Sequence, residues 1–248
     1  MDIAFKRIAT KREFECRLTP DRALETLEDA SAFLEDRGVL TLTPDCALPS
    51  LFGACHEEPW SDAPGFGSWP KTKYWWPAAL PARATKLHKG KTLFVGDRVA
   101  HAIAPLCLSE LDGAREGRHG EEERRFVEHL AAAGRSTTEE LKEELALDTR
   151  TFRRTRARLE RVGAVASRGL IFEREGEPHR HTSEFRLWDV EAAGDPDDAL
   201  RELFVAGVRA AVLAPEREAL HWFSWPVPKE ALADERLTRL EGGWVAAA

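Results

Sequence analysis

RTFRRTRARLER occupies residues 150–161 and has the spacing of an amphipathic helix. At about 100° per residue, Phe152, Thr155 and Leu159 fall on one stripe, whereas arginines gather on the opposite stripe around Ala157. The apolar stripe is expected to pack on the protein, which leaves guanidinium groups facing a partner. A small residue within a cationic face lets a helix approach a groove, while flanking guanidinium groups bind phosphates in bidentate geometry.

The segments around this helix predict a winged helix. Two amphipathic segments precede it, and two strand-like segments with a turn between them follow it. The five elements are expected at residues 122–133, 136–145, 149–162, 165–173 and 180–188. The alternative for the basic helix is a solvated face with ion pairs, but only Glu160 within it could pair with its six arginines.

Similar patterns on either side predict an α+β, mainly helical fold of tandem winged-helix modules. We expect three regions, at residues 1–112, 121–190 and 196–248. The first is a degenerate winged helix with a basic hairpin, and the other two are clearer copies. In the first region, at residues 1–112, we expect helices over residues 20–37 and 48–54, a strand over 39–42 and a hairpin within 86–95. Helices over 99–111, 198–213 and 215–223 and a hairpin turning at 242–243 are also expected.

Charge is distributed unevenly along the 248 residues. The formal net charge is −7, yet residues 71–98 and residues 150–168 each hold seven basic side chains against one acidic side chain. Such segregation focuses a positive field on one surface. No segment has the pattern of a membrane span or signal peptide, and the four cysteines form no CxxC pair. These features favour a soluble protein of the reducing cytoplasm.

The sequence contains no Asn and no Gln. Loss of these thermolabile side chains is typical of a thermophilic or strongly codon-biased source. It also excludes the bidentate reading of adenine by an amide side chain. Direct base contacts would therefore rest on Arg or Lys with guanine, on carboxylates with cytosine, or on apolar contact with thymine.

Double-stranded DNA is the polyanion that these features favour, and the candidate contacts come from three elements. They are Arg150, Arg153, Arg154, Arg158 and Arg161 of the basic helix, His179, Arg180 and His181 of the wing, and Lys86, Lys89 and Lys91 of the hairpin. The two wing histidines could also ligate a metal, but no third ligand is evident, so phosphate contact is preferred. We expect neither a metal nor a cofactor.

Aromatic side chains near residue 70 alternate with lysines, as in sites that hold unpaired bases. The candidates for base stacking are Tyr74, Trp75 and Trp76. The alternative is that these rings close a small hydrophobic core.

Three segments together resemble a known family. They are GVLTLTP at residues 38–44, KTLFV at residues 91–95 and the winged helix at residues 122–188. Their succession resembles the bacterial AlkZ/YcaQ-like tandem winged-helix DNA glycosylases, which remove alkylated or crosslinked purines. The chain is similar to a shortened relative of that family.

The resemblance implies where hydrolytic chemistry would lie. The family carries a Gln-aliphatic-Gln or Gln-x-Asp motif, and Thr41 and Thr43 stand at the matching positions. A hydroxyl is a poor base, so Asp45 is a further catalytic candidate, with a turn-forming role as its alternative. Phe94 stands where the family tends to place a histidine.

We therefore expect a DNA-binding protein that recognises alkylated or crosslinked DNA in repair, and the sequence does not decide whether it excises bases. One alternative is a non-enzymatic winged-helix transcriptional regulator, which would usually dimerise on two half-sites. A monomer is favoured because no long coiled-coil segment is present. Another alternative is an interaction module whose arginine face binds an acidic protein.

Overall fold

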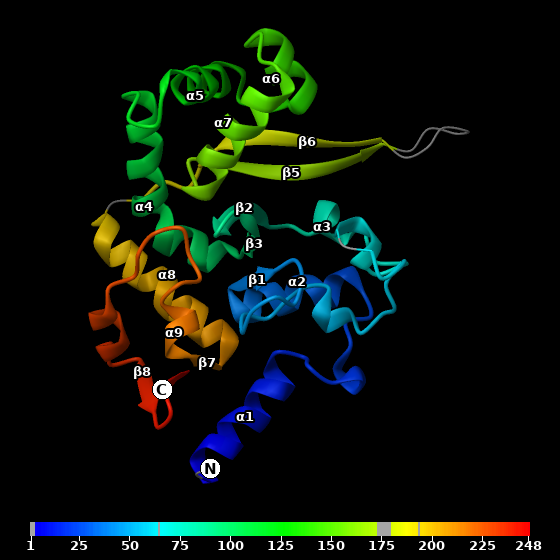
Figure 1. Cartoon of the computed structure of the whole chain (residues 1–248), viewed down its shortest axis with the longest axis vertical. Helices are drawn as coiled ribbons and strands as arrows, with labels where there is room; N and C mark the ends of the chain where they lie inside the picture. Colours follow the sequence, from blue (N-terminus) through cyan, green and yellow to red (C-terminus); the bar gives the residue numbers. More distant parts are fainter. Residues whose placement is uncertain (1–2, 64, 173–179, 193) are drawn as a thin grey trace.

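The computed structural model describes residues 3–63, 65–172, 180–192 and 194–248. Its helices are α1 (Ile3–Glu15), α2 (Leu27–Arg37), α3 (Trp76–Ala79), α4 (Asp97–Arg115), α5 (Glu121–Ala133), α6 (Thr138–Glu144), α7 (Thr149–Arg161), α8 (Pro196–Ala211) and α9 (Glu216–Ala219). Its strands are β1 (Val39–Thr41), β2 (Arg83–His88), β3 (Lys91–Val95), β4 (Arg135–Thr137), β5 (Val165–Phe172), β6 (Arg180–Leu187), β7 (Leu213–Pro215), β8 (Leu237–Leu240) and β9 (Trp244–Ala247). Figure 1 shows α5, α6, α7 and the β5–β6 hairpin at one end of the molecule, with α1 and both chain termini at the other.

Six antiparallel strands form the larger sheet, in the order β1-β3-β2-β5-β6-β4. Strands β5 and β6 pair from Val165 opposite Leu187 to Phe172 opposite Arg180. A single pair of residues, Ala84 opposite Ser167, joins β2 to β5. This junction places the N-terminal hairpin and the β5–β6 hairpin in one sheet. A second antiparallel sheet has the order β7-β9-β8.

Three hydrophobic clusters lie between these elements. One contains Phe126, Phe152 and Phe185 and packs α5, α6 and α7 on the β5–β6 hairpin. A second lies among α2, β1 and α3. The largest joins α4 and α8 to strands of both sheets and reaches from Val39 to Val245. Because this cluster spans residues of all three expected regions, their division at residues 112 and 196 stays a prediction.

The central elements follow the order expected of a winged helix. Helices α5, α6 and α7 are succeeded by strands β5 and β6, which confirms the expected helix, helix, basic helix and hairpin. Thr137 caps α6 in a capping box with Glu140, and Gly134 ends α5 with a positive φ of 78°. The short strand β4, which pairs with β6, was not expected. The number of winged-helix modules in the chain stays a prediction.

The N-terminal half departs from the expected elements in three places. The helix expected over residues 20–37 begins only at Leu27, because Thr26 and Asp29 form a capping box there. Residues 20–22 form a separate 3₁₀ turn. The helix expected over residues 48–54 is replaced by a 3₁₀ turn at Gly53–Cys55. Helix α1 was not expected, since its apolar residues follow no single stripe.

The remaining expected elements are present with shifted ends. Helix α4 begins two residues earlier and continues to Arg115, with Pro105 in its interior. Helix α9 ends at Ala219, four residues before the expected end. The C-terminal hairpin turns at Gly242 and Gly243, which both have positive φ, as expected. No helix in the described ranges is long and apolar enough to cross a membrane.

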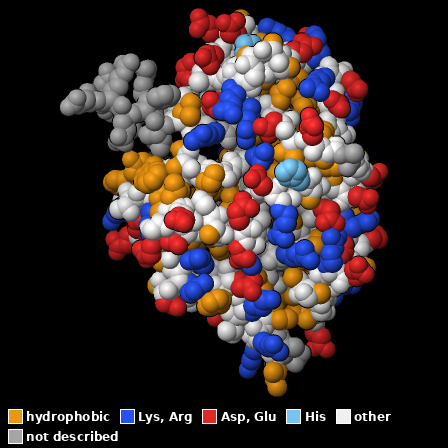
Figure 2. Space-filling view, turned by 180° about the vertical axis from the view of Figure 1, so that it is seen from behind, with side chains coloured by type: hydrophobic (Ala, Val, Ile, Leu, Met, Phe, Trp, Pro, Cys, Tyr) orange, Lys and Arg blue, Asp and Glu red, His pale blue; other side chains and the backbone are white. Residues whose placement is uncertain are grey.

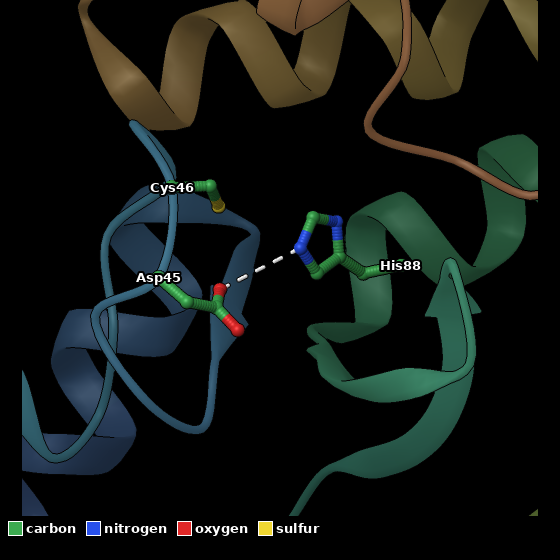
Figure 3. A group of neighbouring side chains, drawn as sticks. All are labelled: Asp45, Cys46 and His88. Atoms are coloured by element: carbon green, nitrogen blue, oxygen red, sulfur yellow. Dashed lines mark ion pairs between the residues drawn. The ribbon is translucent and has the colours of Figure 1, made fainter.

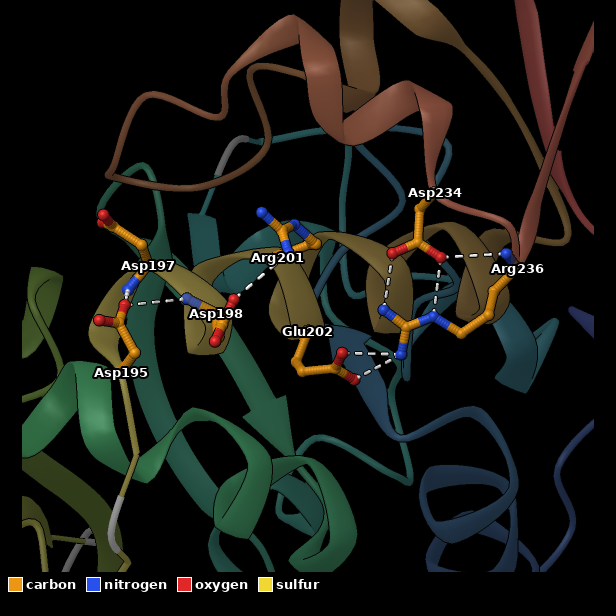
Figure 4. A network of polar contacts seen from close by, with 7 residues as sticks. All are labelled: Asp195, Asp197, Asp198, Arg201, Glu202, Asp234 and Arg236. Atoms are coloured by element: carbon orange, nitrogen blue, oxygen red, sulfur yellow. Dashed lines mark hydrogen bonds and ion pairs between the residues drawn. The ribbon is translucent and has the colours of Figure 1, made fainter.

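Arg236, directly before β8, joins the C-terminal segment to α8 through an ion pair with Glu202. The Arg236 guanidinium contacts the Asp234 carboxylate at 2.7 Å and the Glu202 carboxylate at 2.7 Å, as Figure 4 shows. The same guanidinium lowers the pKa of Asp234 to about 2, chiefly by hydrogen bonding. At its start, α8 is capped by the Asp195 carboxylate, which accepts from the amides of Asp197 and Asp198.

Candidate nucleic-acid interface

Helix α7 is fixed at its start and along its apolar stripe. The Asp148 carboxylate accepts hydrogen bonds from the amides of Arg150 at 2.7 Å and Thr151 at 3.0 Å, which satisfies two N-terminal donors of the helix. These bonds also lower the pKa of Asp148. Phe152 and Leu159 are buried in the central cluster. The opposite side of α7 is thereby held toward solvent.

Several arginines of α7 carry charge that no carboxylate of the described residues neutralises. Arg150, Arg153 and Arg154 are exposed, and within the part of the chain that the structure describes no carboxylate forms an ion pair with their side chains. Ala157 is exposed on the same face. This face of α7 is therefore exposed and positively charged, and contact of its arginines with a polyanion stays a prediction.

The other arginines of α7 have structural partners. Arg156 pairs with buried Glu160 at 3.1 Å. Arg158 donates to the carbonyl of His119 at 2.5 Å and to buried Glu123 at 3.2 Å, although 51% of its side chain stays exposed. Because Glu123 lies near the start of α5, Arg158 ties α7 to that helix. Because carboxylates pair with Arg156 and Arg158, these two side chains offer less free positive charge to a partner than unpaired arginines do.

A groove of about 660 Å³ lies beside the exposed row. Its lining residues are Lys89, Arg154, Ala157, Arg158, Arg161, Val162, Phe223 and Ser224. The turn between β2 and β3 forms one wall, where Arg161 Nη2 donates to the Lys89 carbonyl at 3.5 Å. Gly90 has φ of 84°, and a Cβ atom there would lie 2.6 Å from Arg161 Nε. The glycine thus lets the arginine lie flat against the turn.

The three hairpin lysines differ in their surroundings. Lys89 is exposed. Lys91 is paired, because its ammonium lies 2.5 Å from the Asp45 carboxylate. Lys86 donates to Thr92 Oγ1 at 2.6 Å, and burial lowers its pKa. Of the three, Lys89 therefore offers the most accessible charge.

The expected wing contacts cannot be placed in the same way. His179 lies outside the described residues. Arg180 and His181 begin strand β6, where their backbones pair with Phe172 and Ile171. Their side chains lie outside what the structure describes. Contacts by these residues stay a prediction.

Of the three catalytic candidates, Thr41 ends β1, whereas Thr43 and Asp45 lie in the loop after it, and their side chains do not converge. The Thr41 hydroxyl is buried and lies 3.0 Å from the carbonyl of Thr43 and 3.3 Å from that of Pro49. Thr43 is half-buried. The Asp45 carboxylate turns instead to Lys91 and to His88 Nε2, which is 3.6 Å away. The structure thus places Asp45 beside His88, a residue that no sequence pattern indicated.

A second cavity, of about 300 Å³, lies between α3, the β2–β3 hairpin and the β5–β6 hairpin. Its lining includes the aromatic rings of Trp69, Tyr74 and Phe94, together with hydroxyl groups and Lys86. No carboxylate belongs to the described lining. Leu42, between the two candidate threonines, also contacts the cavity. Figure 2 shows the molecule hollowed on the side where α3 lies.

The aromatic candidates divide between this cavity, the surface and the core. Tyr74 lines the cavity. Trp75 is 40% exposed. Trp76 is 4% exposed, belongs to the N-terminal cluster and has the Lys73 ammonium 5.4 Å from its ring centre. Only Tyr74 and Trp75 therefore offer surface on which a base could stack.

The described elements define a fold of antiparallel sheets and packed helices, and the same fold occurs in a solved protein. Streptomyces sahachiroi DNA glycosylase AlkZ aligns with 100% of this chain and 71% of its own, with a TM-score of 0.57 and 17% sequence identity. The chain therefore has an AlkZ-like fold, as the sequence resemblance indicated. Comparison with models of protein families gives no match, and neither does comparison with curated protein sequences.

Proposed function

We propose that this protein binds double-stranded DNA through the exposed face of α7, the Lys89 turn and the β5–β6 wing. The observation that carries the proposal is the row formed by Arg150, Arg153 and Arg154, whose guanidinium groups lack carboxylate partners among the described residues. Unpaired guanidinium groups beside a groove bind phosphates without first breaking an internal ion pair. The small side chain of Ala157 leaves room for close approach to a backbone.

A salt titration of duplex binding tests this interface. The variant Arg153→Ala/Arg154→Ala should bind a labelled duplex about tenfold or more weakly, and the slope of log affinity against log salt should become less steep by about two units. Arg201→Ala/Arg209→Ala removes the same charge from exposed positions on α8 and is the matched control. Equal slopes in the wild type and the α7 variant would exclude the proposed interface.

We further propose that the DNA recognised is alkylated or crosslinked DNA in repair, within the cytoplasm. Two observations support this proposal: the likeness of the fold to a DNA glycosylase, and the cavity beside α3, whose aromatic rings could hold an unstacked base. The protein should act as a monomer. Dimerisation with preference for one palindromic sequence would instead favour the regulator.

Lesion binding and base excision can be separated in one assay. Because the described cavity has no carboxylate and the Thr41 hydroxyl is already hydrogen-bonded, we expect tighter binding to an N7-alkylated duplex than to an unmodified duplex, without alkali-labile abasic sites. Abasic product that disappears in Asp45→Ala or Thr43→Ala would instead establish a hydrolase. Equal affinity for both duplexes would contradict lesion recognition.

A further inference from the structure

Three side chains from two segments of the chain converge at the β2–β3 hairpin. Asp45 and Cys46 lie in the loop after β1, and His88 ends β2. Figure 3 shows the side chains of Asp45 and Cys46 on one side of a small gap and the imidazole of His88 on the other. One carboxylate oxygen, the Sγ atom and one ring nitrogen all lie within 4.8 Å of one another. Oxygen, sulfur and nitrogen donors at such spacing form a ligand set for zinc.

The orientation of His88 leaves one ring nitrogen available. Its Nδ1 atom lies 2.7 Å from the carbonyl oxygen of Trp222. A carbonyl oxygen only accepts hydrogen bonds, so Nδ1 carries the proton of the neutral ring and Nε2 carries a lone pair. A metal-binding histidine is commonly oriented by such a bond from its other nitrogen to a carbonyl group. Burial lowers the pKa of His88, which favours this neutral form.

The free nitrogen faces a carboxylate oxygen. His88 Nε2 lies 3.6 Å from Asp45 Oδ1. With the ring neutral, two electron-pair donors thus face each other across the gap, and a cation between them would satisfy both. Lys91 binds the other carboxylate oxygen, Oδ2, and so orients Asp45 without covering Oδ1.

Charged side chains of both signs surround the gap. Lys91 and Lys89 lie near His88, whereas Glu218 lies near Cys46 and accepts a hydrogen bond from the amide of Ala47 at 2.6 Å. Burial raises the pKa of the Cys46 thiol to about 12. A cysteine binds a metal as the thiolate, so the thiol proton leaves when the metal binds.

We propose that Asp45, Cys46 and His88 bind one Zn²⁺ ion through the carboxylate Oδ1, the thiolate and Nε2. The thiol proton passes to solvent as the Zn–S bond forms. Bond lengths of about 2.0–2.3 Å place tetrahedral ligands about 3.3–3.8 Å apart. The 3.6 Å between His88 Nε2 and Asp45 Oδ1 already lies in that range, and the three ligand atoms are all within 4.8 Å of one another, so only a small closure is needed. Three protein ligands leave a fourth position for water on the open side of Asp45. The ion would link the loop after β1 to the hairpin.

Cobalt provides a direct probe of the thiolate ligand. The full chain, treated with chelator and reductant, is titrated with Co²⁺ and then with Zn²⁺. We expect one Co²⁺ per chain, a thiolate-to-cobalt absorption band and its loss on addition of Zn²⁺. Calorimetric titration with Zn²⁺ in buffers of different ionisation enthalpy should show about one proton released per ion, because only the thiol must lose a proton.

Variants separate this site from the other cysteines and histidines. Cys46→Ser should abolish the absorption band, and His88→Ala should weaken binding at least tenfold. Cys55→Ser and His221→Ala are matched controls that should bind as the wild type does. His221 has a similar Nδ1 contact, 2.7 Å from the carbonyl of Arg217, but its exposed ring belongs to no such cluster of described ligands.

Folding is checked by melting each variant with and without Zn²⁺. Zn²⁺ should raise the melting temperature of the wild type and leave that of Cys46→Ser unchanged, since a ligand stabilises only the form that binds it. Absence of a thiolate band in the wild type, or its persistence in Cys46→Ser, would overturn the proposal. Because Cys46→Ser changes a single atom, the test stands even where His88→Ala fails to fold. This site does not depend on the proposed DNA binding.

Discussion

The two basic regions of the chain hold equal net charge, yet they differ in how much of it is accessible. Residues 71–98 and 150–168 each contain seven basic side chains and one acidic side chain. In the first region, Lys71, Lys73, Arg83 and Lys91 pair with carboxylates outside the hairpin strands. On α7, by contrast, four of the six arginines have no such partner among the described residues, namely Arg150, Arg153, Arg154 and Arg161.

This difference shows that a basic segment and a basic surface are separate properties. Charges counted along a sequence measure the total, whereas a phosphate contacts only those cations that the fold leaves unpaired and exposed. Acidic partners of this first region come from segments that precede it, such as Glu58 for Lys71 and Asp45 for Lys91. Figure 2 accordingly shows basic and acidic side chains intermingled over one face of the molecule.

Charge reversal should give the largest contrast between the regions. Arg154→Glu places a carboxylate among guanidinium groups at the groove, so duplex affinity at 0.15 M salt should fall at least about 100-fold. The matched reversal Lys71→Glu lies in the paired region and should change affinity much less. Fluorescence anisotropy with one duplex compares the two. If both variants lost duplex affinity equally, the two basic regions would not differ in how accessible their charge is to DNA.

A substitution where α7 contacts the β2–β3 turn should have an intermediate effect on duplex affinity. Gly90→Ala adds a Cβ atom 2.6 Å from Arg161 Nε at a residue with φ of 84°. The left-handed backbone should cost about 1 kcal/mol in the free energy of unfolding. Displacement of Arg161 should also weaken duplex binding, by less than the reversal at Arg154. Denaturant unfolding and anisotropy measure both. Unchanged stability and affinity would show that Arg161 does not lie against this turn.

The smallest expected effect concerns Lys86, whose buried charge lowers the free energy of unfolding. Burial lowers the pKa of Lys86 in the folded state below its value in the unfolded chain. At a pH between these two pKa values the unfolded chain binds more protons than the folded protein, so the free energy of unfolding of the wild type should rise with pH across this interval. Lys86→Met should therefore raise the free energy of unfolding at pH 7, and this gain should shrink as the pH rises. Duplex affinity should change little. Denaturant unfolding at several pH values tests this, and destabilisation at pH 7 would contradict it.

The parts of the fold that the sequence predicted well are those with strong local signals. Helix α7 has a regular apolar stripe and an Asp148 cap, and the hairpin strands have turn residues between them. Helix α1 lacked such a stripe and was missed. Helix α2 was given too early a start because Thr19 and Pro20 also resemble a helix start, whereas Thr26 carries the actual capping box.

The candidate site could be predicted only where it lies on one element. The outward face of α7 follows from helical spacing alone. The contacts of Asp45 with Lys91 and His88 join residues more than 40 positions apart, and no local pattern signals them. The same holds for the burial of Trp76, which depends on α2 and β1 packing around it.

The most direct test of the α7 interface is a map of the arginines that DNA covers. The protein is modified with phenylglyoxal in the absence and presence of excess duplex, and each arginine is quantified by mass spectrometry. We predict that duplex protects Arg150, Arg153 and Arg154, whereas Arg201 and Arg209 on α8 react equally in both conditions. Unchanged reactivity of the three α7 arginines, with protection elsewhere, would contradict the account.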